Sequence, residues 1–105
     1  MADLGVFGAT VPAEYGGDGL SLPEFQPYLE NAAMGPGCGR MFAHVGNGFW
    51  RPLAAFGTAK QHEVVRDMAA GRAFCAFALT EPAGGTGRDL HSRAERDGDG
   101  WRATG

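Results

Sequence analysis

Apolar residues in the first 72 positions fall into sets whose spacing matches one face of a helix. The sets are Leu22, Phe25, Leu29 and Ala33; Met41, Val45, Phe49, Leu53 and Phe56; and Val64, Val65 and Met68. Ser21 and Thr58 each stand three residues before a Glu or a Gln, which is the spacing of a capping box. The pattern predicts helices at 21–35, 40–56 and 58–71.

Proline and glycine modify these predicted helices. Pro27 removes one backbone hydrogen bond and is expected to bend the first helix. Gly46 and Pro52 lower the helix propensity of the second, so propensity and periodicity disagree there. Ahead of them, residues 1–4 have the length of a last helical turn that Gly5 ends, and we expect the chain to begin inside a helix.

The period changes after residue 71, where strand-length patterns replace helical ones. The continuous apolar run from Phe74 to Leu79 predicts a strand, and a Gly-rich loop follows at 82–87. Residues 91–96 and 101–104 flank an Asp-Gly-Asp-Gly segment, which predicts a β-hairpin. Helices come first and strands last, so the sequence predicts an α+β chain that stops in or just after its hairpin.

Composition and charge exclude several classes of protein. The chain has 105 residues and a net charge of −3 without a basic run, which argues against nucleic-acid binding. No apolar stretch approaches the ~20 residues that span a bilayer, and no signal peptide is evident. Cys38 and Cys75 are expected to be free thiols in a reducing, cytoplasmic compartment, although one bridge stays open. His44, His62 and His91 have no metal-ligand spacing.

The passage from Phe77 to Thr86 carries the strongest chemical signal. Thr80 presents a hydroxyl at the end of the predicted strand, and the glycines that follow leave backbone N–H groups unobstructed, as a phosphate requires. Neither a Walker A loop nor a Rossmann fingerprint fits this spacing. From the residues alone, such a loop is more often a plain turn than a ligand site. Glu81 is expected to be structural and to accept hydrogen bonds at the turn.

Motifs along nearly the whole chain resemble the acyl-CoA dehydrogenase family in collinear order. The resemblance is carried by Phe-Ala-Leu-Thr-Glu-Pro and the small residues after it, by an early Pro-x-Glu-Tyr-Gly-Gly turn, by a Phe-Gly-Thr-x-x-Gln helix junction, by a helix end and by the hairpin: 77–86, 11–21, 56–61, 68–71 and 96–101. It implies that 1–72 is the latter part of an N-terminal helical domain. Residues 73–105 would begin a β-barrel-like middle domain.

The resemblance also implies a flavin site. Family members bind FAD, abstract an α-proton from an acyl-CoA thioester and pass the β-hydride to the flavin. Matching positions predict FAD contacts by Phe77, Leu79, Thr80, Gly85 and Thr86, with Thr86 also near the substrate. Gly87 stands where the family usually has Asp, which leaves the substrate subclass open, and Arg88 is either a phosphate ligand or a solvated loop residue.

The family's catalytic base is a Glu in a later helical bundle, and neither Glu81 nor Glu95 matches it. We therefore expect no catalytic residue within this chain, no turnover by the chain alone, and exposed apolar side chains where the bundle would pack. Electron-transfer flavoprotein is the acceptor that the resemblance implies, and the full-length protein is expected to be a homo-oligomer. Two alternatives stay open: a non-catalytic subunit that supplies binding surface, and an acyl-CoA oxidase or flavin monooxygenase.

Overall fold

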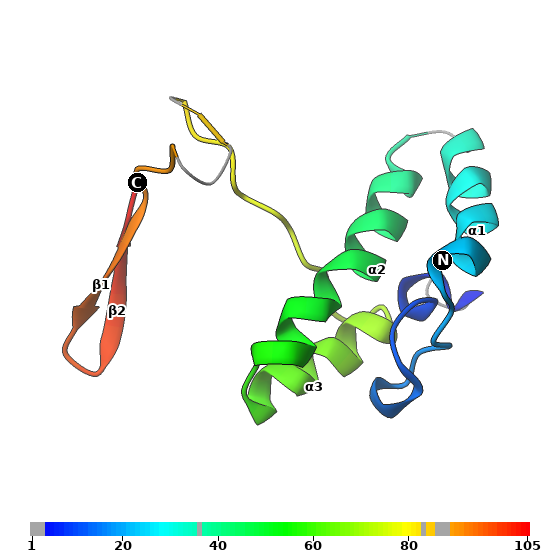
Figure 1. The fold of residues 1–105 in the computed structure, drawn as a ribbon, viewed down its shortest axis with the longest axis horizontal. Helices are drawn as coiled ribbons and strands as arrows, with labels where there is room; N and C mark the ends of the chain where they lie inside the picture. The colour runs from blue at the N-terminus through cyan, green and yellow to red at the C-terminus, as the bar shows by residue number, and fades with distance from the viewer. Residues whose placement is uncertain (1–3, 36, 83, 86–88) are drawn as a thin grey trace.

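The computed structural model describes residues 4–35, 37–82, 84–85 and 89–105. In chain order, its elements within these residues are the 3₁₀ turns η2 (Val6–Gly8) and η3 (Ala13–Tyr15), the helices α1 (Leu22–Met34), α2 (Gly39–Phe56) and α3 (Ala59–Ala69), and the strands β1 (Arg93–Asp97) and β2 (Gly100–Thr104). Helices followed by an antiparallel hairpin confirm the α+β fold class (Figure 1).

Both predicted capping boxes are present. The Glu24 carboxylate accepts hydrogen bonds from the backbone N–H and the hydroxyl of Ser21, at 2.8 and 2.6 Å. At α3, Thr58 donates its N–H to the Gln61 side chain at 2.8 Å and accepts the Gln61 N–H at 3.4 Å. These bonds satisfy N–H groups that the first turn of a helix leaves unpaired, which explains why the helices begin where the sequence predicts.

The predicted interruptions leave the helices continuous. α1 runs through Pro27 without a break, and α2 runs through Pro52. Asn31 donates its side-chain amide to the Pro27 carbonyl at 2.9 Å. Gly5 has φ 67°, the left-handed conformation typical of the residue after a helical turn, while the predicted turn at 1–4 is described only at Leu4.

Two small apolar clusters hold the helices together. α1 and α2 lie side by side, and α3 crosses near the C-terminal end of α2 (Figure 1). One cluster joins Phe25 of α1 to Ala43 of α2 through Ala9. The other joins the turn around Val11 to Val65 of α3. Both clusters include residues from the segment before α1, residues 5–20, which we call the N-terminal segment. This segment therefore forms the centre of the helical part.

A buried asparagine fastens that segment to α2. Asn47 is 4% exposed, and its side-chain carbonyl accepts the Thr10 N–H at 2.8 Å. Its amide donates to the Val6 carbonyl at 2.6 Å and to the Ala43 carbonyl at 2.9 Å. The Thr10 hydroxyl in turn donates to the backbone carbonyl of Asn47 at 2.7 Å and accepts the Trp50 indole N–H at 3.0 Å. A segment without regular structure thereby has its buried polar groups satisfied.

The turn after this segment depends on a glycine. A Cβ built on Gly17 would overlap the backbone oxygens of Gly8 and Val11. The neighbouring residues close the turn, because Asp18 donates its N–H to the Gly8 carbonyl at 3.0 Å and Gly19 donates to the Val11 carbonyl at 2.9 Å. In the Gly-Gly pair of the early motif, Gly17 is therefore required by a close approach of backbone to backbone, and Gly16 by its positive φ of 84°.

The predicted strand from Phe74 to Leu79 is wrong. These residues are extended but pair with no strand among the described residues (Figure 1). A strand needs a neighbour to receive its backbone hydrogen bonds, and this segment leads from the helical part toward the hairpin instead (Figure 1). Phe77 packs its ring against Phe49 of α2, with ring centroids 4.9 Å apart. The apolar run thus reflects contact with the helical part.

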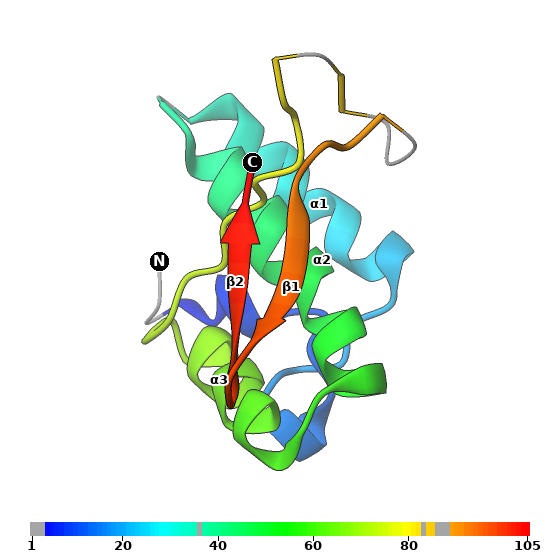
Figure 2. The same ribbon diagram turned by 90° about the vertical axis from the view of Figure 1, so that its left-hand side faces the viewer.

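The hairpin is confirmed close to its predicted bounds. β1 and β2 are antiparallel, Arg96 faces Trp101, and Gly98 takes the positive φ of 61° that the turn requires. Every residue of both strands is exposed, and the hairpin stands away from the helices (Figures 1 and 2). Arg102 and Asp97 form an ion pair at 2.7 Å across the turn.

Large apolar side chains are exposed on several elements, as expected from the sequence. They include Leu22 and Met34 on α1, Phe56 at the end of α2 and Trp101 in the hairpin, with Phe56 89% exposed. Within the part of the chain that the structure describes, no helix is long and apolar enough to span a bilayer.

Replacing Asn47 by Ala tests the fastening of the N-terminal segment. The Asn47→Ala variant loses the partners of the buried Thr10 N–H and of the Val6 carbonyl. We expect the free energy of unfolding, measured by urea titration, to fall by roughly 3 kcal/mol. Asn31→Ala is the matched control, because Asn31 is exposed, and its cost should stay within about 0.5 kcal/mol. Equal costs for the two variants would contradict the account.

Candidate flavin-facing turn and apolar pocket

Residues 73–79, which we call the linker, follow α3, and the chain beyond them folds into a tight turn. Glu81 and Gly84 form an isolated bridge, in which the Glu81 N–H donates to the Gly84 carbonyl at 2.7 Å and the Gly84 N–H donates back at 3.1 Å. Only small or exposed side chains border this turn. The glycines of the predicted loop are thus used to bring backbone close to backbone.

Thr80 and Gly85, two residues predicted to bind a cofactor, lie against each other. A Cβ built on Gly85 would stand 3.1 Å from Thr80 Cα and 3.2 Å from Thr80 Oγ1, tighter than most contacts between such atoms. Thr80 is exposed and Gly85 is half-buried. A threonine hydroxyl and backbone amide groups in one place can together bind a polar ligand.

The Glu81 carboxylate links this turn to the hairpin. One oxygen accepts the His91 N–H at 2.7 Å and the other accepts the Ser92 N–H at 2.9 Å. Hydrogen bonds from the Ser92 side chain and from the His91 and Ser92 backbone hold the pKa of Glu81 below its ordinary value. The expectation that Glu81 accepts hydrogen bonds at the turn is confirmed.

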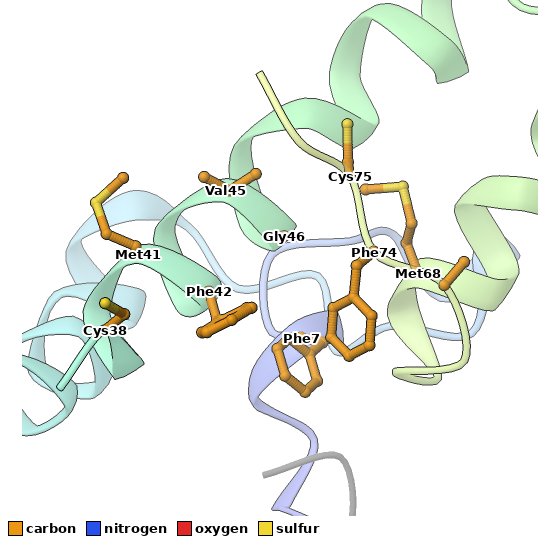
Figure 3. Close-up of a pocket in the computed structure, with 10 residues that line it drawn as sticks. Phe7, Cys38, Met41, Phe42, Val45, Gly46, Met68, Phe74 and Cys75 are labelled. Atoms are coloured by element: carbon orange, nitrogen blue, oxygen red, sulfur yellow. The ribbon is translucent and has the colours of Figure 1, made fainter. Parts of the chain in front are cut away.

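An apolar pocket lies next to the linker (Figure 3). It encloses about 160 Å³. Its lining comes from η2, α2, the end of α3 and the linker: Phe7, Cys38, Met41, Phe42, Val45, Gly46, Met68, Ala73, Phe74 and Cys75. The Phe74 ring meets the rings of Phe7 and Phe42 edge-on, with centroids 5.5 and 6.0 Å apart. The linker therefore forms one wall of the pocket.

A second groove lies between α1 and α2. It encloses about 340 Å³ and is lined by residues of both helices, mostly apolar on α1 and mostly polar on α2: Leu22, Phe25, Gln26, Leu29, His44, Asn47, Gly48 and Arg51. Cys38 and Cys75 are free. Among the described residues, no group of His, Cys, Asp and Glu side chains is arranged to hold a metal ion.

Comparison with known proteins decides the family. Residues 1–72 match the sequence profile of the acyl-CoA dehydrogenase N-terminal domain. The chain belongs to the acyl-CoA dehydrogenase family.

Several curated members of the family are similar to this chain. The human mitochondrial very long-chain specific acyl-CoA dehydrogenase is 37% identical over 90 residues, which cover 82% of this chain and 13% of that protein. The L-prolyl-[peptidyl-carrier protein] dehydrogenase of Pseudomonas fluorescens is 34% identical over 105 residues, 93% of this chain and 27% of that protein. The 3-sulfinopropanoyl-CoA desulfinase of Variovorax paradoxus is 29% identical, over 100% of this chain and 27% of that protein. The chain thus spans about an eighth to a quarter of these relatives.

The predicted site residues of this acyl-CoA dehydrogenase chain fall in different places. Thr80 and Gly85 come together at the turn. Leu79, the residue before Thr80, is half-buried, and the ring of Phe77 packs against Phe49 of α2. Thr86 lies outside the described residues, as does Arg88.

The sequence analysis did not predict the apolar pocket or the buried hydrogen bonds of Asn47. Phe7 and Phe42 come from separate segments, so no local pattern joins them to Phe74. Asn47 sits between two glycines in a helix, where a polar residue usually faces water. Asn47 stands four residues after Ala43 and three residues before Trp50, and this helical spacing with apolar residues was the available signal.

Truncating Phe74 tests whether the linker is docked on the helices. Although 66% exposed, Phe74 makes two edge-to-face ring contacts. We expect Phe74→Ala to lower the free energy of unfolding by about 1–2 kcal/mol. Phe56→Ala, at an 89% exposed ring, should change it by less than about 0.5 kcal/mol. A linker that is not docked would make the two variants alike in urea titration.

Proposed function

We propose that this chain forms one wall of the active site of an FAD-dependent acyl-CoA dehydrogenase. The reaction is α,β-dehydrogenation of an acyl-CoA thioester, with the hydride passed to FAD. Family membership supports the reaction class. The observation that carries the proposal is the close approach of Thr80 to Gly85, which puts an exposed threonine beside a glycine backbone at the two matching positions.

The residues at the turn fit a flavin. The backbone of Gly85 leaves no room for a Cβ beside Thr80, so the surface there is made of backbone and a hydroxyl, suited to a flat, polar ring. We assign FAD contacts to Thr80 and Gly85, with Phe77 and Leu79 on the approach to them. FAD supplies the hydride acceptor, while the protein supplies binding, orientation and hydrogen bonds. A hydroxyl such as that of Thr80 can donate a hydrogen bond, which stabilises negative charge on the atom that accepts it.

The apolar pocket fits the acyl chain of a thioester. Its volume of about 160 Å³ is close to that of an apolar cavity, about 150 Å³, that holds a benzene ring. Phenylalanine, methionine and valine line it, and such side chains accept hydrocarbon without a desolvation cost. We propose that part of the acyl chain enters here, and that Thr86 binds the substrate closer to the thioester.

Glu81 is unsuited to be the catalytic base. Both of its carboxylate oxygens already accept hydrogen bonds, and these bonds lower its pKa, which weakens it as a proton acceptor. We propose that residues outside this chain supply the base. The electron acceptor would then be electron-transfer flavoprotein, and the complete protein a cytoplasmic homo-oligomer.

Substitution of Thr80 in the complete protein tests the flavin wall. Thr80→Val keeps the shape and removes the hydroxyl, whereas Thr80→Ser keeps the hydroxyl. We expect Thr80→Val to lower kcat for acyl-CoA-dependent dye reduction by roughly tenfold, and Thr80→Ser to keep most of it. Flavin content measured by absorbance separates lost binding from lost chemistry. Unchanged kcat and flavin content in Thr80→Val would contradict the assignment.

Filling the pocket tests the place of the acyl chain. Val45→Phe adds volume inside the pocket, and Val64→Phe adds the same volume on the exposed face of α3. We expect Val45→Phe to lower kcat/KM for long acyl-CoA relative to short acyl-CoA by roughly tenfold. The ratio is taken within one variant, so differences in folded fraction cancel. Val64→Phe should leave the ratio unchanged, and an equal shift in both variants would place the acyl chain elsewhere.

A further inference from the structure

We propose that Glu81 is a positioning residue, whose carboxylate holds the turn bearing Thr80 and Gly85 in a fixed place relative to the start of the hairpin. This inference rests on the proposed function, because Thr80 and Gly85 matter to it as FAD contacts. It adds a residue that touches neither flavin nor substrate in that proposal.

The side chain of Glu81 makes a paired contact. Its two oxygens accept the backbone N–H groups of two consecutive residues, His91 at 2.7 Å and Ser92 at 2.9 Å. The partners lie 10 and 11 residues further along the chain, immediately before β1. A carboxylate that accepts two amides has a defined orientation, and bonds to a charged acceptor are stronger than neutral ones.

The backbone of the same residue fixes the other side of the turn. Glu81 exchanges hydrogen bonds with Gly84 at 2.7 and 3.1 Å. A Cβ built on Gly84 would stand 2.8 Å from Cβ of Asp89, so the chain also passes close to itself at this point. Gly85, next to this bridge, is the residue that presses on Thr80. One residue therefore joins the cofactor-facing turn to the hairpin through both its side chain and its backbone.

The clamp depends on the charge of the carboxylate, because protonation turns one oxygen into a hydroxyl donor and makes it a much weaker acceptor for an N–H. The hydrogen bonds lower the pKa of Glu81. Their contribution is therefore fully present above the ordinary pKa of Glu and is lost as the pH falls through the lowered value. Asp89, His91 and Arg93 are the nearest titratable or charged side chains along the returning chain, so titration must be followed at Glu81 itself.

NMR spectra of the 105-residue chain test the clamp. We expect the amide signals of His91 and Ser92 to titrate together with the Glu81 carboxyl carbon, with a midpoint below the ordinary Glu value. Glu81→Gln should abolish this titration and shift the amide signals of Thr80 and Gly85. The inference is overturned if the two amides titrate independently of Glu81, or if the Thr80 and Gly85 signals stay in place.

Glu95→Gln is the matched control for these spectra. Glu95 lies on β1 opposite Arg102, is exposed, and its carboxylate makes no hydrogen bond or ion pair with any described residue. Its substitution removes the same charge from the same region without touching the turn. The Thr80 and Gly85 signals should therefore stay in place in this variant. A shift as large as that in Glu81→Gln would assign the effect to net charge and would overturn the inference.

FAD titration of the complete protein separates the clamp from the proposed function. We expect Glu81→Gln to raise the Kd for FAD several-fold while the apoprotein keeps its unfolding midpoint, and Glu81→Asp to recover part of the affinity. Equal FAD affinity in wild type and Glu81→Gln would overturn the positioning role and leave the proposed function standing. If no variant binds FAD while the amide titration holds, the proposed function fails and the clamp stands.

Discussion

The hydrogen bonds of one buried side chain, Asn47, hold the helical part of this structure together. The segment before α1 has no ladder of its own, yet Thr10 is 3% exposed and Val11 is fully buried. Asn47 supplies the partners that this backbone needs, because its carbonyl accepts the Thr10 N–H and its amide donates to the Val6 carbonyl. With that segment in place, Val11 packs on α3 and Ala9 packs between α1 and α2.

The same scaffold places the candidate site. Phe7 of the fastened segment and Phe42 of α2 receive Phe74, and Phe49 receives Phe77, so the linker leaves the helices along a defined line. Beyond the linker, the Glu81 carboxylate fixes the chain by hydrogen bonds to His91 and Ser92. No apolar cluster among the described residues includes the turn at Thr80 and Gly85. Apolar contacts thus define the pocket, and hydrogen bonds define the polar turn next to it.

Local signals in the sequence predicted local structure well. The capping boxes at Ser21 and Thr58 located two helix starts, and the Asp-Gly-Asp-Gly segment located the hairpin. The strand predicted at Phe74 was wrong because an apolar run does not specify a pairing partner, and among the described residues the rings of Phe74 and Phe77 instead contact aromatic rings of the helical part. Thr80 and Gly85 were predicted through the family motif, whereas the role of Asn47 and the pocket depend on contacts between residues far apart in the sequence, such as Asn47 with Val6 and Phe7 with Phe74. The domain boundary at residue 72 and the binding roles of all the predicted site residues, which are Phe77, Leu79, Thr80, Gly85 and Thr86, stay predictions.

The central claim is that these residues hold one wall of a flavin site whose catalytic base lies elsewhere. It is tested most directly by assaying acyl-CoA-dependent dye reduction, with FAD added, for the 105-residue chain and for the complete protein side by side. The account predicts turnover by the complete protein and none by the chain alone. Turnover by the chain alone would contradict it, because a catalytic base would then have to lie within these 105 residues.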